Sequence, residues 1–535
     1  MASTTAETEL KLRLSPADAR RVSRLGLLRG IKSRSQLLEN VYYDTPDHAL
    51  AAQKTALRHR RIGDTWLITV KTAKVSKGGL STRPEWEYPC APGELDFSGV
   101  DHDALRKRLE MLRPVLVPLF ATNFRRRTWM IEPHPDLSIE LALDEGEIIA
   151  TPADQDGMPP RRRPICEIEL ELKKGSALGL FDIGLRLADK LALMPENESK
   201  AQRGQRLYRG IPDAPREAKP SRFDPVLPPL TAFEQLAHGC LNHFLANAEG
   251  VRSADAVEYI HQARIALRRL RALLRVFSPL LPADFVLAYN EGWRRFADQL
   301  GSARDFDVLI EETLPSISRH YEGHDGIETF VEYAGARRQE AREAARASFH
   351  QPALGQLTLR FLVDLARLDR QAPGCDHPNA PHRHHHNERR DGDDNTPTLR
   401  DFAIRRLNKR LARIRRDAVA TDHQSVEALH RLRIQFKRLR YSVEFFAPFF
   451  NTEAIGTYAS ELKSMQDSLG RINDLERALT VEAMAPDAVR CKLVSGWLSA
   501  TQRAQIAQFP AIVKRFTALP APWEPASRST RDRAR

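Results

Sequence analysis

Cysteine and long apolar runs are scarce in this chain, and each shortage excludes a class of protein. Only five of the 535 residues are cysteine, and none lies in a Cys-x-x-Cys pair. This excludes the disulfide framework of a small secreted domain and favours a reducing compartment. No apolar run approaches the roughly 18 residues that span a bilayer. The first residues are polar and acidic, without the basic and apolar segments of a secretion signal. We therefore expect a cytoplasmic protein with no membrane partner.

Basic residues, in contrast, are abundant. Lys and Arg number 82 against 70 Asp and Glu, which gives a net charge of +12 and a pI near 9.5. Such an excess predicts an anionic partner: nucleic acid, acidic lipid or a phosphate compound. The length predicts about two to four domains.

Residues 165–173 alternate charged and apolar side chains. As a strand, this segment carries three carboxylates and a lysine on one face: Glu167, Glu169, Glu171 and Lys173. Carboxylates so close together repel one another unless cations neutralise them, and their oxygens suit Mg²⁺ or Mn²⁺. The alternative is the solvated face of an edge strand. The start of the chain favours a metal site, because Glu7, Glu9 and Lys11 repeat the pattern.

Predicted strands between these two segments carry arginines instead. Arg58 and Arg60 share one strand face, and Arg125 and Arg127 share another. If the strands close into a barrel, its interior has opposed acidic and basic walls. That interior suits a polyanion with divalent metal ions, since guanidinium groups clamp phosphate oxygens while carboxylates hold the metal.

Residues 7–11 (ETELK) resemble the ExExK signature of the CYTH family, the triphosphate tunnel metalloenzymes. Further elements match in order over about residues 5–210: Tyr43-Asp44-Thr45, Leu57 to Arg60, the strand ending in Lys71, Arg83 to Glu87, Arg125 with Arg127, EIELEL, and Ser199-Lys200 with Arg203. The resemblance implies an eight-stranded antiparallel β-tunnel with flanking helices, within an α+β multidomain protein. It also implies binding and Mg²⁺- or Mn²⁺-dependent hydrolysis of a triphosphate, or in some relatives cyclisation of ATP.

Together with the needs of phosphoryl transfer, this resemblance assigns residues to roles. The expected substrate-binding cations are Lys11, Arg58, Arg60, Lys71, Arg83, Arg125, Arg127, Lys200 and Arg203. The expected metal ligands are Glu7, Glu9, Asp144, Glu167, Glu169 and Glu171. The expected catalytic residues are Lys71, Arg58 and Arg127, with Lys71 also a candidate general base.

A proline-rich linker, residues 211–230, follows the predicted tunnel domain of residues 1–210. Beyond it, a helical pattern occurs twice: residues 261–271 recur as residues 430–440, 169 positions later. Each copy has a histidine and three basic residues at i, i+3, i+7 and i+10, which is one stripe of a helix. A single stripe would be an ordinary solvated face. Two stripes that face one another would form a groove that repels itself without an anion.

The repeated pattern resembles the CHAD domain, the conserved-histidine α-helical domain, over about residues 231–515. Its repeats would span about 231–370 and 398–515 and form an all-α duplicated bundle. The resemblance implies binding of inorganic polyphosphate through His261, Arg264, Arg268, Arg271, His430, Arg433, Lys437 and Arg440. No aromatic residues interleave the stripes for base stacking, which disfavours nucleic acid. Residues 372–396, rich in histidine, are predicted to be a disordered loop, and residues 520–535 a basic tail.

These features predict an inorganic triphosphatase that converts tripolyphosphate to pyrophosphate and phosphate, with a polyphosphate-binding domain that would also bring it to polyphosphate granules. Two alternatives stay open. One is a hydrolase or cyclase acting on thiamine triphosphate, a nucleoside triphosphate or ATP. The other is a non-catalytic polyphosphate-granule protein. The sequence leaves the oligomeric state and the choice between Mg²⁺ and Mn²⁺ open.

Overall fold

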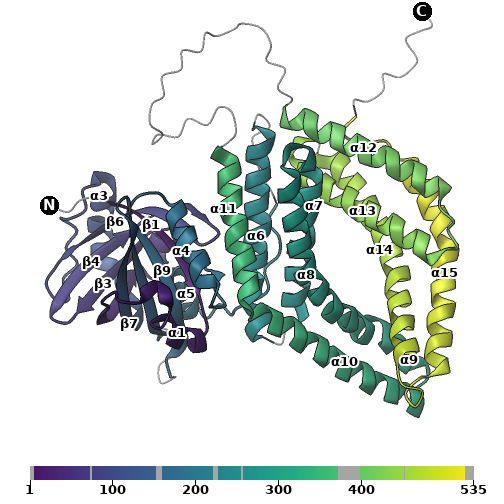
Figure 1. Ribbon diagram of the computed structural model, residues 1–535, viewed down its shortest axis with the longest axis horizontal. Coiled ribbons are helices and arrows are strands. Elements are labelled where there is room, and N and C mark those ends of the chain that lie inside the picture. The colour runs from purple at the N-terminus through teal and green to yellow at the C-terminus, as the bar shows by residue number, and fades with distance from the viewer. Residues whose placement is uncertain are drawn as a thin grey trace, which may run out of the picture. The chain divides into compact units, whose positions relative to one another are not determined.

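The chain forms two compact units (Figure 1). The computed structural model describes residues 5–72, 75–151, 159–220, 227–254, 257–370, 398–450 and 452–524. Unit 1 comprises residues 1–214 with 349–366, and unit 2 comprises residues 215–348 with 367–535. The predicted histidine-rich loop and residues 525–535 of the predicted tail lie outside the described residues.

Two expectations from composition can be compared with the described residues. None of the helices in those ranges is both long and apolar enough to cross a membrane. The four described cysteines, Cys90, Cys166, Cys240 and Cys491, are all free thiols.

Unit 1 is built on a closed antiparallel barrel. Its strands are β1 (Thr5–Arg13), β2 (Arg34–Asp44), β3 (Ala56–Ile62), β4 (Thr65–Lys71), β6 (Leu80–Pro89), β7 (Val117–His134), β8 (Leu137–Ala150) and β9 (Arg161–Lys174). Hydrogen bonding runs β1–β9–β8–β7–β2–β3–β4–β6, and β6 pairs again with β1. The short strands β5 (Val75–Lys77) and β10 (Met194–Pro195) pair with β6 and β1 at the margins. The predicted eight-stranded tunnel is thus confirmed.

The alternation that predicts strands also decides which side chains point inward. On β9, Ile168 and Leu170 are fully buried on the outer face, where α4 (Leu178–Ala188) packs against the barrel. Glu167 and Glu169 therefore point into the interior. The register sets Lys11 of β1 opposite Glu169, so opposite charges are cross-strand neighbours.

Helix α5 (Lys200–Tyr208) packs against aromatic side chains of the barrel. Ser199 and Gln202 form a capping box that fixes where the helix begins. Gly204 lies so close to β7 that an added Cβ would come within 2.1 Å of the Phe120 ring. Phe120 in turn stacks on Tyr42 at 4.7 Å between ring centroids. This close approach brings the first turn of α5 to the charged interior.

The other helices of unit 1 lie outside the barrel. They are α1 (Pro16–Val22), which Ser15 caps, α2 (Ala49–Ala52) and α3 (Asp103–Leu112). Most of α11 (Pro352–Arg370) also belongs to this unit, although the sequence predicts it to be part of the first helical repeat. Its Gln356 Nε2 donates to Asp189 Oδ1 at 2.8 Å, and its Leu362 packs against Gly78. An amphipathic helix shows that one face is buried, but the pattern does not identify what covers that face.

The regular secondary structure in the described part of unit 2 is all helical. Its helices are α6 (Pro229–Ser253), α7 (Val257–Phe277), α8 (Ala283–Val308), α9 (Leu314–His320), α10 (Asp325–Phe349), α12 (Leu399–Ala420), α13 (Val426–Phe446), α14 (Thr452–Met484) and α15 (Lys492–Thr517). Helices α6, α7 and α8 pack in succession in one half, as do α12, α13, α14 and α15 in the other, and α7 contacts α13 across the halves. Phe277 and Phe446, which are equivalent under the 169-residue shift, lie 6.0 Å apart between ring centroids. The two copies of the repeated helix therefore face one another.

Candidate active site and basic groove

A group of three carboxylates lies inside the barrel. Oxygens of Asp144, Glu167 and Glu169 all lie within 4.8 Å of one another. The Lys200 Nζ is 2.6 Å from Asp144 and 3.0 Å from Glu169, and it also pairs with Glu167. Against the effect of burial, Arg203 and Lys200 lower the pKa of Glu167 to about 2. Glu167 is therefore an ionised oxygen donor, and the three carboxyl groups lie at a spacing that fits Mg²⁺ or Mn²⁺.

A second acidic group is centred on Glu7 and Glu85. The Lys71 Nζ contacts both carboxylates, at 2.8 Å and 2.6 Å respectively. Burial raises the pKa of Glu85 to about 7 against the opposing charge of Lys71, and a hydrogen bond with Glu7 acts in the same direction as burial. Arg83 contacts Glu7 at 3.3 Å and Glu9 at 3.0 Å. Glu85 therefore keeps its proton to a higher pH than an isolated glutamate, whereas Lys71, despite burial, holds the pKa of Glu7 below its usual range.

Arginines gather beside these acids. Arg58 and Arg60 lie 3.4 Å and 3.2 Å from the same oxygen of Glu87, and the Arg60 Nε donates to Asn40 at 2.9 Å. Burial and the neighbouring Arg58 lower the pKa of Arg60 to about 10. Arg58 also lies 3.8 Å from Glu85, but that carboxyl group has a pKa raised to about 7 by burial, so the two guanidinium groups are only partly neutralised and leave a surplus of positive charge. A phosphate group would neutralise that surplus.

The inward arginine of β7 is Arg126 rather than its two predicted neighbours. Arg126 makes two hydrogen bonds to Asp144, at 2.8 Å and 2.7 Å, and one to Glu169 at 2.5 Å. Arg125 is exposed, and Arg127 lies over the Trp129 ring on the opposite face of the strand. The predicted placement of Arg125 and Arg127 inside the tunnel is therefore corrected. A strand has one inward face, and here the even-numbered position occupies it.

The remaining predicted tunnel residues can now be placed. The interior holds Lys11, Arg58, Arg60, Lys71, Arg83, Lys200 and Arg203, together with Glu7, Glu9, Asp144, Glu167 and Glu169. Glu171 is only partly buried and pairs with Lys173 at 2.5 Å, apart from the three clustered carboxylates. The sequence prediction gives no role to Glu85 and Glu87, although alternation from Arg83 places both on the same face.

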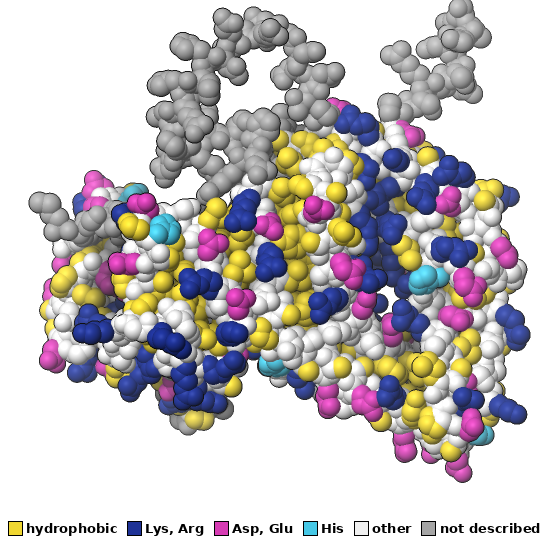
Figure 2. Space-filling model, in the orientation of Figure 1, with side chains coloured by type: hydrophobic (Ala, Val, Ile, Leu, Met, Phe, Trp, Pro, Cys, Tyr) yellow, Lys and Arg dark blue, Asp and Glu magenta, His cyan; other side chains and the backbone are white. Residues whose placement is uncertain are grey.

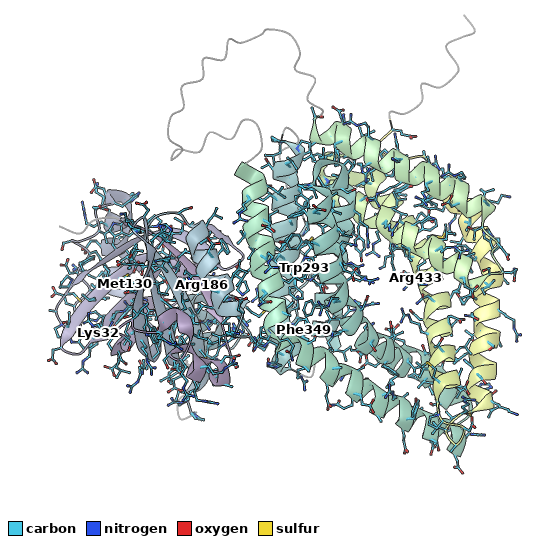
Figure 3. All side chains as sticks on the ribbon, in the orientation of Figure 1. Lys32, Met130, Arg186, Trp293, Phe349 and Arg433 are labelled. Carbon is cyan, nitrogen blue, oxygen red and sulfur yellow. The ribbon has the colours of Figure 1, made fainter. Side chains whose placement is uncertain are left out.

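The predicted basic groove of unit 2 lies between α7 and α13. Lys and Arg side chains gather in a hollow there (Figure 2), and Arg433 lies on the side of α13 that faces α7 (Figure 3). Arg264 has Arg268 and Arg433 beside it, and these charges add to burial to lower its pKa to about 10. Burial, with Arg433 and Arg268 next to it, lowers the pKa of Lys437 to about 5. Cations crowded this closely indicate a site for an anion.

The predicted histidines lie in different surroundings. The Nδ1 of His261 is buried without a hydrogen-bond partner, and burial together with Arg304 lowers the pKa of His261 to about 4. His430 instead lies 2.7 Å from Asn473 and lines a cavity with Glu427. Of the other predicted groove residues, Arg271 contacts Asn290 at 3.4 Å and Arg440 pairs with Glu444 at 2.7 Å. The centre of the groove is therefore more strongly cationic than its ends at Arg440 and His430.

A closed barrel lined by ionised carboxylates and arginines, followed along the chain by a duplicated helical unit with a basic groove, defines a two-domain protein. Residues 5–205 match the CYTH domain family and residues 235–481 match the CHAD domain family. The chain is thus a CYTH domain followed by a CHAD domain.

Known relatives match either one domain or both. An inorganic triphosphatase of Haemophilus influenzae is 35% identical over 199 residues, which is 37% of this chain and 54% of that protein. The match thus spans about half of that relative's length. An uncharacterised Mycobacterium tuberculosis protein is 26% identical over 430 residues, 77% of this chain and 76% of its own. The crystal structure of a CHAD domain from the plant Ricinus communis is 25% identical, with a TM-score of 0.49, and covers 58% of this chain and 98% of its own.

Proposed function

We propose that unit 1 is a metal-dependent triphosphatase that hydrolyses tripolyphosphate to pyrophosphate and phosphate. The observation that carries this proposal is the pairing of the carboxylate cluster Asp144, Glu167 and Glu169 with surplus arginines inside one closed barrel. The 35% identity of the tunnel region to an inorganic triphosphatase supports the choice of reaction.

Some residues of the barrel would bind the charged phosphate groups, and others would position the substrate. Arg58, Arg60 and Arg126 would bind phosphate oxygens, in bidentate fashion where their forks allow it. Lys71, held between Glu7 and Glu85, would orient the end of the chain that reacts. When bound to the carboxylate cluster, Mg²⁺ or Mn²⁺ would supply neutralisation of the charge on the phosphate oxygens. Phosphoryl transfer needs such positioning and charge stabilisation more than a protein nucleophile.

Side-by-side rates for several triphosphates test the choice of substrate. Phosphate release by the full chain should be fastest with tripolyphosphate and slower with ATP, thiamine triphosphate and long polyphosphate. A preference for thiamine triphosphate or ATP would replace the inorganic substrate by an organic one. No release from any of them would favour the non-catalytic alternative.

For unit 2 we propose binding of inorganic polyphosphate in the groove around Arg264, Arg268, Arg433 and Lys437, and through it an association with polyphosphate granules. The groove offers cations but no carboxylate cluster like that of the barrel among its described residues. Binding without hydrolysis is therefore expected. Affinity should fall steeply as salt rises, since each Lys or Arg contact releases counterions from the polyanion.

A further inference from the structure

The two repeats of unit 2 are not equivalent at one end of the groove. In one half, Arg269 Nη1 pairs with Glu444 at 2.6 Å, next to Cys240 of α6. The 169-residue shift that relates the repeats carries Arg269 to Arg438, and Glu444 back to Arg275. The ion pair of one half is thus replaced, in the other half, by two arginines.

The helix that packs beside these arginines adds further positive charge. The sequence of α12 contains eight Lys and Arg residues, whereas α6, its counterpart in the first repeat, contains only Arg252. Two of the eight, Arg406 and Arg410, face Arg275 and Arg438. Arg406 Nη2 donates to the backbone carbonyl of Arg275 at 3.0 Å, and burial together with Arg406 and Arg438 lowers the pKa of Arg410 to about 10.

These four arginines have no acidic partner within the described ranges of the chain. None of them forms an ion pair there, and the Nε atoms of Arg406, Arg410 and Arg438 are buried without a hydrogen-bond acceptor. Burial and the neighbouring Arg271 and Arg438 lower the pKa of Arg275 to about 10. Four partly buried guanidinium groups without a counter-charge destabilise the fold unless an anion occupies the space between them.

The cluster continues the groove rather than standing apart from it. Arg264, Arg268, Arg271 and Arg275 form one stripe along α7, since they stand at i, i+4, i+7 and i+11. At 1.5 Å per residue, Arg275 lies about 16 Å along the helix from Arg264. A phosphate chain bound at Arg264 cannot reach the cluster if it spans less than about 16 Å, whereas a chain that spans more can reach it.

We propose that Arg275, Arg406, Arg410 and Arg438 form a second phosphate-binding subsite, which makes unit 2 selective for long polyphosphate chains over short ones. The proposal rests on the proposed function of the groove and adds to it the chain length that is recognised. Phosphate oxygens supply the hydrogen-bond acceptors that the buried Nε atoms lack. Because anionic groups repeat along a polyphosphate chain, one chain can bind at both ends of the arginine stripe of α7.

Affinities of the full chain for short and long polyphosphate, measured in EDTA to prevent turnover, test the proposal. Arg406→Gln/Arg410→Gln should weaken long-chain binding at least tenfold, flatten its salt dependence and leave short-chain binding within twofold. Arg405→Gln/Lys409→Gln is the matched control, because it removes the same charge from exposed positions of α12. Equal long-chain affinity of the two double variants would overturn the subsite.

A second variant separates binding from folding. Arg275→Glu restores, opposite Arg438, the ion pair that the other half has between Arg269 and Glu444. It should raise the melting temperature while weakening long-chain binding, a combination that misfolding cannot produce. A raised melting temperature with unchanged long-chain affinity would overturn the proposal.

The remaining outcomes distinguish this inference from the function on which it rests. If the wild-type protein binds neither chain length, the proposed function of the groove fails as well. If the wild-type protein binds both chain lengths and the subsite variants bind long chains as tightly as wild type, the chain-length inference fails but the proposed function of the groove stands. If single-stranded RNA binds as tightly as long polyphosphate and the same variants lose this binding, the assignment to polyphosphate is overturned.

Discussion

Glu169 is the residue on which the cations of the tunnel converge. Lys11 and Arg126 lie 2.5 Å from its oxygens and Lys200 lies 3.0 Å away. Although burial opposes ionisation, these three charges, Lys11 first, hold the pKa of Glu169 well below its usual range. A carboxylate that remains ionised in a buried site can serve as a metal ligand at any physiological pH.

Two adjacent arginines of β7 provide a matched comparison at the residue scale. Arg126→Ala leaves Asp144 and the substrate phosphates without their guanidinium partner. The resulting fall in kcat/KM should correspond to a loss of about 2 to 5 kcal/mol in transition-state binding. Arg125→Ala removes an exposed arginine one position away and should change kcat/KM less than threefold. Steady-state kinetics with tripolyphosphate measure both, and a larger loss at Arg125 would reverse the placement of the two side chains.

The groove should take up a proton when it binds its anion. The pKa of Lys437 is about 5 in the free protein, because of burial and the neighbouring arginines, so this amine is neutral at pH 7. A bound phosphate chain favours the ammonium form, and affinity should therefore rise as the pH falls toward about 5. In the absence of the anion, Lys437 is protonated in the unfolded chain but neutral in the folded protein above about pH 5. The free energy of unfolding of unit 2 should therefore rise as the pH rises above about 5.

Calorimetry of polyphosphate binding in two buffers that differ in ionisation enthalpy measures how many protons the protein takes up at pH 7. Wild-type protein should take up close to one more proton than Lys437→Gln. Lys409→Gln, at an exposed position, should behave as wild type. Identical proton uptake by all three proteins would contradict the assignment.

At the scale of elements, the seating of α5 is the most sensitive contact of unit 1. An added methyl group in Gly204→Ala would meet the Phe120 ring, so we expect a loss of about 1 to 3 kcal/mol in the free energy of unfolding. Activity should fall with it, because α5 carries Lys200 and Arg203 to the carboxylates. Gly26→Ala is the control, since nothing lies within 4 Å of its added Cβ. Denaturant unfolding should separate the two, and equal stability would mean that α5 does not pack as described.

The elements also show what the sequence can and cannot predict. Alternation along β1 and β9 predicts the inward carboxylates correctly, because charged and apolar residues differ on the two faces. It cannot assign the inward face of Arg125-Arg126-Arg127, where three consecutive residues are alike. Only the pairing of Arg126 with Asp144 of β8 decides it. The membership of α11 in unit 1 depends likewise on contacts with Gly78 and Gly184, which are remote in sequence.

At the scale of the whole molecule, the two activities should be separable by mutation. Arg264→Glu with Arg433→Glu puts negative charge into both halves of the groove, and should abolish polyphosphate binding at physiological salt. Tripolyphosphate turnover should stay within twofold of wild type, because neither residue belongs to the barrel. Native polyphosphate affinity in this double variant would mean that the stripes are ordinary solvated helix faces.

Metal dependence of tripolyphosphate hydrolysis tests the central claim most directly. Phosphate release by the full chain should be absent in excess EDTA and should return on addition of Mg²⁺ or Mn²⁺. Glu169→Gln should lower the restored rate about 100-fold or more, whereas Glu147→Gln, a partly exposed carboxylate of β8 paired with Arg162, should not. An undiminished rate in EDTA, or a Glu169→Gln protein as active as wild type, would contradict the account of the barrel as a metal-dependent triphosphatase.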